Sequence, residues 1–239
     1  MMAMWLLLYA LGFWSFAFLF MVLKSARDGE TAFGGDFASR MHLAPLLLIK
    51  AVPAGLAALF VFLLRPSVSM FYLLMVVALV LCLLGDIGKG VGLLPGIGLF
   101  ALAHIAFITA FVTQSLTLGL TLLWIAVTGS VFALMLVYVY LLHRYLQSSK
   151  KGLGRFQVPV LFYSLLISIV FCTSVLLWLL SGTLYGSIVV IGAFLFVVSD
   201  SLIAVKEFHH RFSKAELKIL STYYSAIFLF SLNVLVFAF

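Results

Sequence analysis

The sequence predicts an all-α fold, a polytopic membrane bundle of eight transmembrane helices. Of its 239 residues, 66% are hydrophobic and only 9% are charged, which is too little charge to cover the surface of a soluble domain of this size. Several apolar runs reach the length of about 20 residues that a helix needs to cross a hydrocarbon core. These runs lack the polar–apolar alternation of β-barrel strands, so we expect helices.

Short polar or glycine-rich connections separate the apolar segments. They leave no stretch long enough for a soluble domain, so we expect residues 1–239 to form a single integral membrane domain. The first segment lacks a basic N-terminal region and a clear cleavage site, and we interpret it as a retained helix rather than a signal peptide. The predicted spans are 4–23, 43–64, 68–88, 92–113, 116–142, 158–180, 183–207 and 217–239.

Basic residues follow alternate spans. Of the 14 Lys and Arg residues, 12 follow the first, third, fifth and seventh spans, Arg65 lies on the opposite side, and Lys50 lies within a span. Because cytoplasmic loops are enriched in Lys and Arg, we expect both termini to be non-cytoplasmic. The 12 residues are Lys24, Arg27, Arg40, Lys89, Arg144, Lys150, Lys151, Arg155, Lys206, Arg211, Lys214 and Lys218.

The net charge of +7 resides in these connections. No basic face interleaved with aromatic residues accompanies it, so we expect no nucleic-acid partner. Compact loops and the absence of eukaryotic retention signals favour a bacterial inner (plasma) membrane as the location.

Five polar side chains lie inside five different predicted spans. They are Lys50, Asp86, His104, Tyr163 and Asp200. A charge near the bilayer centre costs about 2.5–3.5 kcal/mol, so a retained charge is usually paired or functional. All except His104, which lies near the middle of its span, fall in the cytoplasmic half. This shared depth predicts one polar cavity that opens toward the cytoplasm.

Each of these residues also has a structural interpretation. Asp86 would cap the glycine-rich turn after the third span, and Lys50 would extend to the lipid headgroups. His104 would be a hydrogen-bonded packing residue, and Tyr163 would belong to the interfacial aromatic belt. Asp200, with a serine on each side, would be a buried structural carboxyl. The convergence of the five residues favours a common site.

Several motifs of soluble enzymes are missing. The glycine-rich segment 85–98 lacks the spacing of a phosphate-binding loop, and Gly92 and Gly96 favour close helix packing instead. The histidines other than His104 lack zinc-ligand spacing. Cys82 and Cys172 both lie within spans, so a disulfide framework is not indicated. We therefore expect no metal and no cofactor.

Four segments, taken in order along the chain, resemble a known family. The segments are Lys50-x-x-Pro53, Leu84-Gly85-Asp86 followed by His104 in "GLFALAHIAFITAF", Val158-Pro159-Val160-x-x-Tyr163, and Ser199-Asp200 in "FLFVVSDSLIAVKEF". Together they resemble the YhhN-like lysoplasmalogenases, a family of eight-helix membrane hydrolases. One departure is that many members of the family have proline directly after the lysine.

The resemblance implies hydrolysis of the vinyl-ether bond of lysoplasmalogens to a fatty aldehyde and glycerophospho-ethanolamine or -choline. The partners that the resemblance implies for this protein are this lysophospholipid and the surrounding membrane lipids. Protonation of the vinyl ether and activation of water need one neutral carboxylic acid and one carboxylate. We assign Asp200 as the acid and Asp86 as the base, and the reverse assignment stays open. The substrate-binding candidates are Lys50, His104, Tyr163 and Ser199.

Three other functions are consistent with buried charges. A proton-coupled transporter or channel would use the same Asp, Lys and His groups, but the outer half of the bundle is almost uncharged. A retinal-type photoreceptor would need a buried lysine such as Lys50, which lies in the second span rather than the last. A non-catalytic lipid-binding protein would need no intact pair of aspartates.

Overall fold

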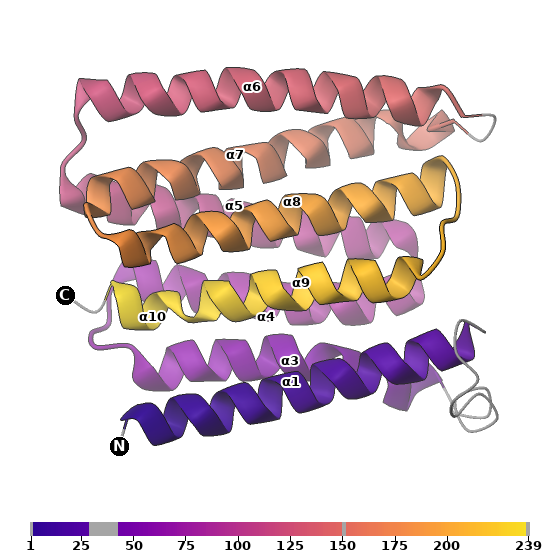
Figure 1. The fold of residues 1–239 in the computed structure, drawn as a ribbon, viewed down its shortest axis with the longest axis horizontal. Helices are drawn as coiled ribbons and strands as arrows, with labels where there is room; N and C mark the ends of the chain where they lie inside the picture. Colours follow the sequence, from indigo (N-terminus) through magenta and orange to yellow (C-terminus); the bar gives the residue numbers. More distant parts are fainter. Residues whose placement is uncertain (1, 29–42, 150–151, 238–239) are drawn as a thin grey trace.

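The computed structural model describes residues 2–28, 43–149 and 152–237. The described chain is a bundle of long helices (Figure 1). Eight of its helical segments are long and apolar enough to cross a membrane, which confirms the predicted fold class. The helices are α1 (Met2–Arg27), α3 (Leu43–Leu64), α4 (Met70–Val91), α5 (Leu93–Leu118), α6 (Leu122–Gln147), α7 (Gln157–Ser181), α8 (Ser187–Phe208), α9 (Ala215–Ser231) and α10 (Asn233–Val236).

Polar caps and glycines set several helix ends. The hydroxyl of Ser69 accepts the N–H of Tyr72 at the start of α4, and Thr121 accepts the N–H of Trp124 at the start of α6. Gly182 ends α7 in the left-handed conformation with φ 62°, which glycine adopts without steric cost. The start of α4 and the end of α7 lie within two residues of the predicted bounds. The connection between the fourth and fifth spans is predicted too early, because α5 continues to Leu118 and α6 begins only at Leu122, after the Thr121 cap.

The connection between the third and fourth spans is shorter and lies later than the predicted spans, 68–88 and 92–113, place it. Helix α4 continues to Val91, and its cap is Gly92. Glycine here allows close packing instead: a Cβ atom on Gly96 of α5 would lie 2.7 Å from Cγ of Lys89. Lys89, which the sequence places in a connection, therefore belongs to the last turn of α4.

Helix α9 lies inside the bundle, where it contacts α8, α3 and α1, and α4 packs along α5. Helix α6 forms one edge (Figure 1) and packs mainly on α7. Within α6 only Val139 and Leu146 are buried. The bundle therefore has a tightly packed centre and one weakly covered side helix.

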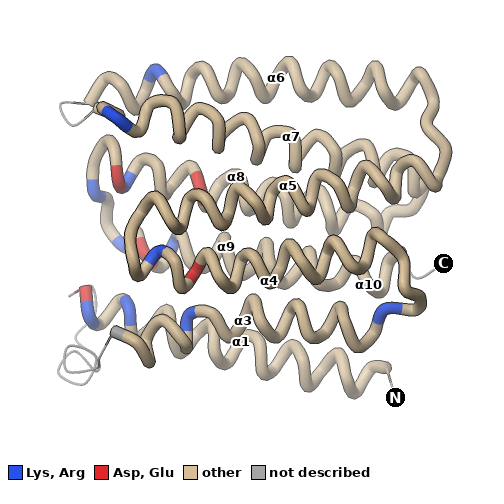
Figure 2. The backbone as a smooth tube through the Cα atoms, turned by 180° about the vertical axis from the view of Figure 1, so that it is seen from behind, with Lys and Arg blue, Asp and Glu red and all other residues tan. Residues whose placement is uncertain are grey.

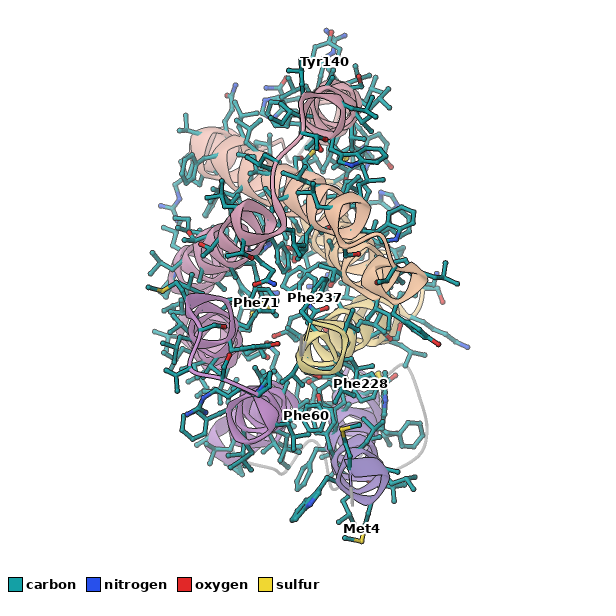
Figure 3. All side chains as sticks on the ribbon, turned by 90° about the vertical axis from the view of Figure 1, so that its left-hand side faces the viewer. Met4, Phe60, Phe71, Tyr140, Phe228 and Phe237 are labelled. Carbon is teal, nitrogen blue, oxygen red and sulfur yellow. The ribbon has the colours of Figure 1, made fainter. Side chains whose placement is uncertain are left out.

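The end of the bundle that carries the two termini is packed with aromatic rings. Tyr9 stacks on Phe60 with ring centroids 4.0 Å apart and on Phe228 at 5.5 Å. Phe71 meets Phe237 edge to face at 5.7 Å. Figure 3 looks onto this end and shows Phe71 and Phe237 on facing sides of the interior. We call the end of the bundle at which these five residues pack the aromatic end.

Charged residues gather at the opposite end of the bundle (Figure 2), where α1, α4, α6 and α8 terminate. We call this the charged end. It carries the basic residues that we counted on the cytoplasmic side, although Arg40, Lys150 and Lys151 lie outside the described residues. The orientation of the bundle in the membrane stays a prediction.

Candidate active site

A cavity of about 490 Å³ lies at the charged end, between α1, α3, α4, α5, α8 and α9. We call it the polar cavity. Four of the predicted site residues line it, namely Lys50, Asp86, Ser199 and Asp200. Tyr163 and His104, which the sequence places in the same cavity, do not line it. Lys50, Asp86 and Asp200 each lie between five and eight residues from the charged end of their helices, so the predicted common depth is confirmed. The other charged residues of the lining are Lys24, Arg27, Lys89, Lys206, Glu207 and Glu216.

Asp86 is buried in α4, with 1% of its surface exposed. The ammonium of Lys50 lies 3.0 Å from its Oδ1, and the hydroxyl of Tyr223 in α9 donates to its Oδ2 at 2.8 Å. Each carboxylate oxygen therefore has a donor from another helix. This geometry is that of a buried ion pair, and the interpretation of Asp86 as a turn cap is wrong.

Lys50 does not extend to the headgroups. Besides Oδ1, its ammonium also contacts the backbone carbonyl of Asp86, at 3.3 Å. Its own carbonyl accepts the hydroxyl of Tyr224 at 3.1 Å. Lys50 thus joins α3 to α4 and, through its backbone, to α9, and its charge is matched by that of Asp86.

Asp200 has different surroundings. Tyr163 of α7 donates its hydroxyl to Oδ2 at 2.7 Å, and Nε2 of His104 in α5 lies 3.8 Å from the same oxygen. In the described part of the chain, no Lys or Arg nitrogen lies within ion-pair distance of Asp200. The five predicted residues therefore form two groups, Lys50 with Asp86, and Asp200 with Tyr163 and His104.

His104 is fully buried. Its Nδ1 lies 2.5 Å from the carbonyl oxygen of Phe100, and a carbonyl only accepts, so we assign the proton to Nδ1. Nε2 then carries a lone pair, and it has no hydrogen-bond partner within the described residues. Because this lone pair faces Asp200, the packing interpretation of His104 accounts for one ring nitrogen and not for the other.

Ser199 lines the polar cavity, but its hydroxyl already donates a hydrogen bond within the protein. It donates to the carbonyl of Ile219 at 3.1 Å and so joins α8 to α9. The side chain is fully buried. Its predicted role in substrate binding stays a prediction, and its observed contact is between helices.

Tyr223 and Lys89 are site residues that the sequence analysis did not identify. The residue spacing along α9 does not reveal which of its faces meets α4, so no sequence signal points to Tyr223. Because glycines flank Lys89, the sequence predicts it in the connection after the third span. Its ammonium lies 5.8 Å from the centroid of the Phe100 ring, and it has no carboxylate within 4 Å in the described regions.

Lys206 and Glu216 form an ion pair across the α8–α9 connection, at the rim of the cavity. This pair, like that of Lys50 and Asp86, leaves little uncompensated charge. Lys89 therefore differs from Lys50 and Lys206 in that no carboxylate oxygen of the described residues lies within 4 Å of its ammonium. Asp200, Asp86 and Glu216 attract it only over longer distances.

The arrangement suits acid–base chemistry. Two carboxyl groups face one cavity, one of them ion-paired and the other held by a phenol beside an imidazole nitrogen. Unequal surroundings allow two carboxyl groups to act in different protonation states. Across residues 2–28, 43–149 and 152–237, no group of three or more His, Cys, Asp or Glu side chains is placed to hold a metal ion.

Comparison with known proteins agrees with the family resemblance. The model of the YhhN family matches residues 46–234, which include both aspartates and all of their side-chain partners described above. Human lysoplasmalogenase TMEM86B is 30% identical over 190 residues, which are 79% of this chain and 74% of that protein. No solved structure matches the chain. Because the family model spans most of its length, the chain belongs to the YhhN family.

Proposed function

We propose that this protein is a membrane hydrolase that cleaves the vinyl-ether bond of lysoplasmalogens. Membership of the YhhN family and the similarity to human lysoplasmalogenase TMEM86B support this substrate class. The observation that carries the proposal is the pair of aspartates, Asp86 and Asp200, which line one cavity in unequal surroundings. The fatty aldehyde and glycerophospho-ethanolamine or -choline are the products.

The reaction proceeds in three steps. Asp200 donates its proton to the β-carbon of the vinyl ether, which generates an oxocarbenium ion. A water molecule adds to the α-carbon as Asp86 accepts its proton, and a hemiacetal results. The bond from the α-carbon to the glycerol oxygen then breaks, the hemiacetal hydroxyl loses its proton to Asp200, and the glycerol oxygen takes the proton held by Asp86. One water is consumed and both carboxyl groups return to their starting states.

The surroundings of each carboxyl group support these roles. Asp86 is paired with the Lys50 ammonium, which suits a base that starts as a carboxylate. Asp200 faces the lone pair on Nε2 of His104. Two lone pairs repel each other, and a proton on the carboxyl group relieves the repulsion. This favours Asp200 as the acid.

We further propose that Lys89 binds the phosphate of the headgroup. The sequence makes Lys50 a candidate for substrate binding, but its ammonium is matched by Asp86. Lys89 lines the polar cavity without a carboxylate partner in the described residues. A compact ammonium is a suitable point charge for a phosphate.

The excess of basic residues at the charged end supports an active site on the cytoplasmic side. The compact loops support a bacterial inner membrane. We propose this location, and both termini then lie on the opposite side.

Substrate comparison tests the function directly. Purified protein is incubated with a lysoplasmalogen and, separately, with an acyl lysophospholipid of the same headgroup and chain length. We expect aldehyde from the first and no fatty acid from the second. Fatty acid release alone would overturn the proposal, and so would the absence of any product from protein whose helical content is intact.

A further inference from the structure

A second, smaller cavity of about 60 Å³ adjoins the polar cavity. We call it the apolar groove. Side chains of α5, α6, α7 and α8 form its walls, including Ile97, Leu142, Val160 and Ala204. Asp200 lines both cavities.

Apart from Lys89, which borders both cavities, the polar side chains of the apolar groove bond to one another or to backbone. The hydroxyl of Tyr138 bonds to that of Ser201, and Ser164 donates to the carbonyl of Val160 at 2.8 Å. Tyr163 donates to Asp200. The groove therefore presents mainly hydrocarbon surface to a ligand. Such a space favours an apolar chain over water or a polar group.

The two cavities meet where the reacting bond of the proposed substrate must lie. In a lysoplasmalogen the vinyl ether joins the polar glycerophosphate to the hydrocarbon chain. Lys89 and Asp200 border both cavities, so a headgroup in the polar cavity and a chain in the groove bring the double bond to Asp200. Resting on the proposed function, we propose that the apolar groove binds the part of the alkenyl chain next to the vinyl ether.

The size of the groove limits how much chain it holds. One water-sized site takes about 10–15 Å³ on this scale, so 60 Å³ corresponds to roughly four to six such sites. The groove therefore holds only the first few carbons. The remainder extends past the edge of the bundle, where α6 buries only Val139 and Leu146.

Binding of saturated ether lysophosphocholines tests the inference without requiring the reaction. The series contains chains from shorter to much longer than the groove. Burial of each methylene strengthens binding by about fourfold. Wild-type affinity is expected to rise at this rate over the first few carbons and then to increase more slowly.

The variant Ala204→Phe fills the groove. It is expected to remove the steep gain over the first carbons and to leave the binding of glycerophosphocholine itself unchanged. The matched control is Ala133→Phe on the exposed side of α6, which adds the same ring outside the groove. The alkyl chain of the ligand can also partition into the membrane, and this contribution is the same for both variants. The difference in affinity between the two variants therefore measures binding in the groove.

A variant with an enlarged groove keeps the inference testable if the filled variant fails to fold. Val160→Ala is expected to lengthen the steep part of the series by about one or two carbons, which a misfolded protein would not show. Identical chain dependence in all four proteins would overturn the inference even if aldehyde is released. If the dependence changes as described but no aldehyde forms, the groove assignment holds and the proposed function fails.

Discussion

The two ends of the bundle differ in what fills their interior. At the charged end, ion pairs and hydrogen bonds surround a cavity of about 490 Å³. At the aromatic end, stacked rings fill the space between α1, α3 and α9, and the hydroxyl of Tyr72 bonds to the carbonyl of Phe237. The bundle thus has a polar cavity at one end and closely packed aromatic rings at the other. This suits an enzyme that admits an amphiphile from one side, and it argues against a transport path across the membrane.

The largest expected effect on stability comes from breaking the buried ion pair of the charged end. Lys50→Met leaves the Asp86 carboxylate with Tyr223 as its remaining side-chain donor. Removal of one partner of a buried pair costs about 3–5 kcal/mol, and we expect a loss of this size in detergent unfolding. The double variant K50M/D86N should lose less because no unpaired charge remains. Wild-type stability in K50M would show that the pair is solvated.

A smaller effect is expected from Lys89, which lines the polar cavity with no carboxylate oxygen within 4 Å among the described residues. Lys89→Gln removes a charge-assisted contact of about 1.5–3 kcal/mol, so KM for the lysoplasmalogen should rise by roughly tenfold to a hundredfold with little change in kcat. Steady-state kinetics measure both. Lys218→Gln is the control because it removes an exposed lysine outside the cavity. An unchanged KM in K89Q would exclude Lys89 as the phosphate ligand.

The smallest effect is expected at the aromatic end. Phe60→Leu loses the stacking of Phe60 on Tyr9, and aromatic pairs contribute about 0.5–1.5 kcal/mol beyond burial. Unfolding should become easier by about this amount, while kcat and KM per folded molecule stay unchanged. A fall in kcat at constant helical content would mean that the two ends are coupled. Activity and unfolding are measured on the same preparation.

The number and order of the helices could be predicted because hydrocarbon thickness fixes the length of an apolar run. The common depth of Lys50, Asp86 and Asp200 followed from counting residues along the helices. Their partners did not follow, because depth does not reveal the face on which a side chain lies. The bond between Tyr223 and Asp86 depends on the rotation of α9 against α4.

Lys89 shows a second limit of sequence reasoning. Glycine on both sides of a lysine is typical of a turn, and the span predicted from the sequence therefore ends at residue 88. In the structure the glycines accommodate neighbouring helices, and α4 runs on to Val91. A helix-packing glycine and a helix-ending glycine have the same sequence signature, so the tertiary contacts decide between them.

The central claim is that Asp86 and Asp200 together carry out the hydrolysis. Its most direct test is aldehyde release from a lysoplasmalogen by Asp86→Asn and Asp200→Asn. The control is Asp28→Asn, which makes the same carboxylate-to-amide change at an exposed residue that does not line the polar cavity. General acid or base catalysis contributes about 10²–10⁴-fold, so each site variant should lose activity by this factor while D28N retains it. Wild-type turnover in either site variant would contradict the two-carboxylate mechanism.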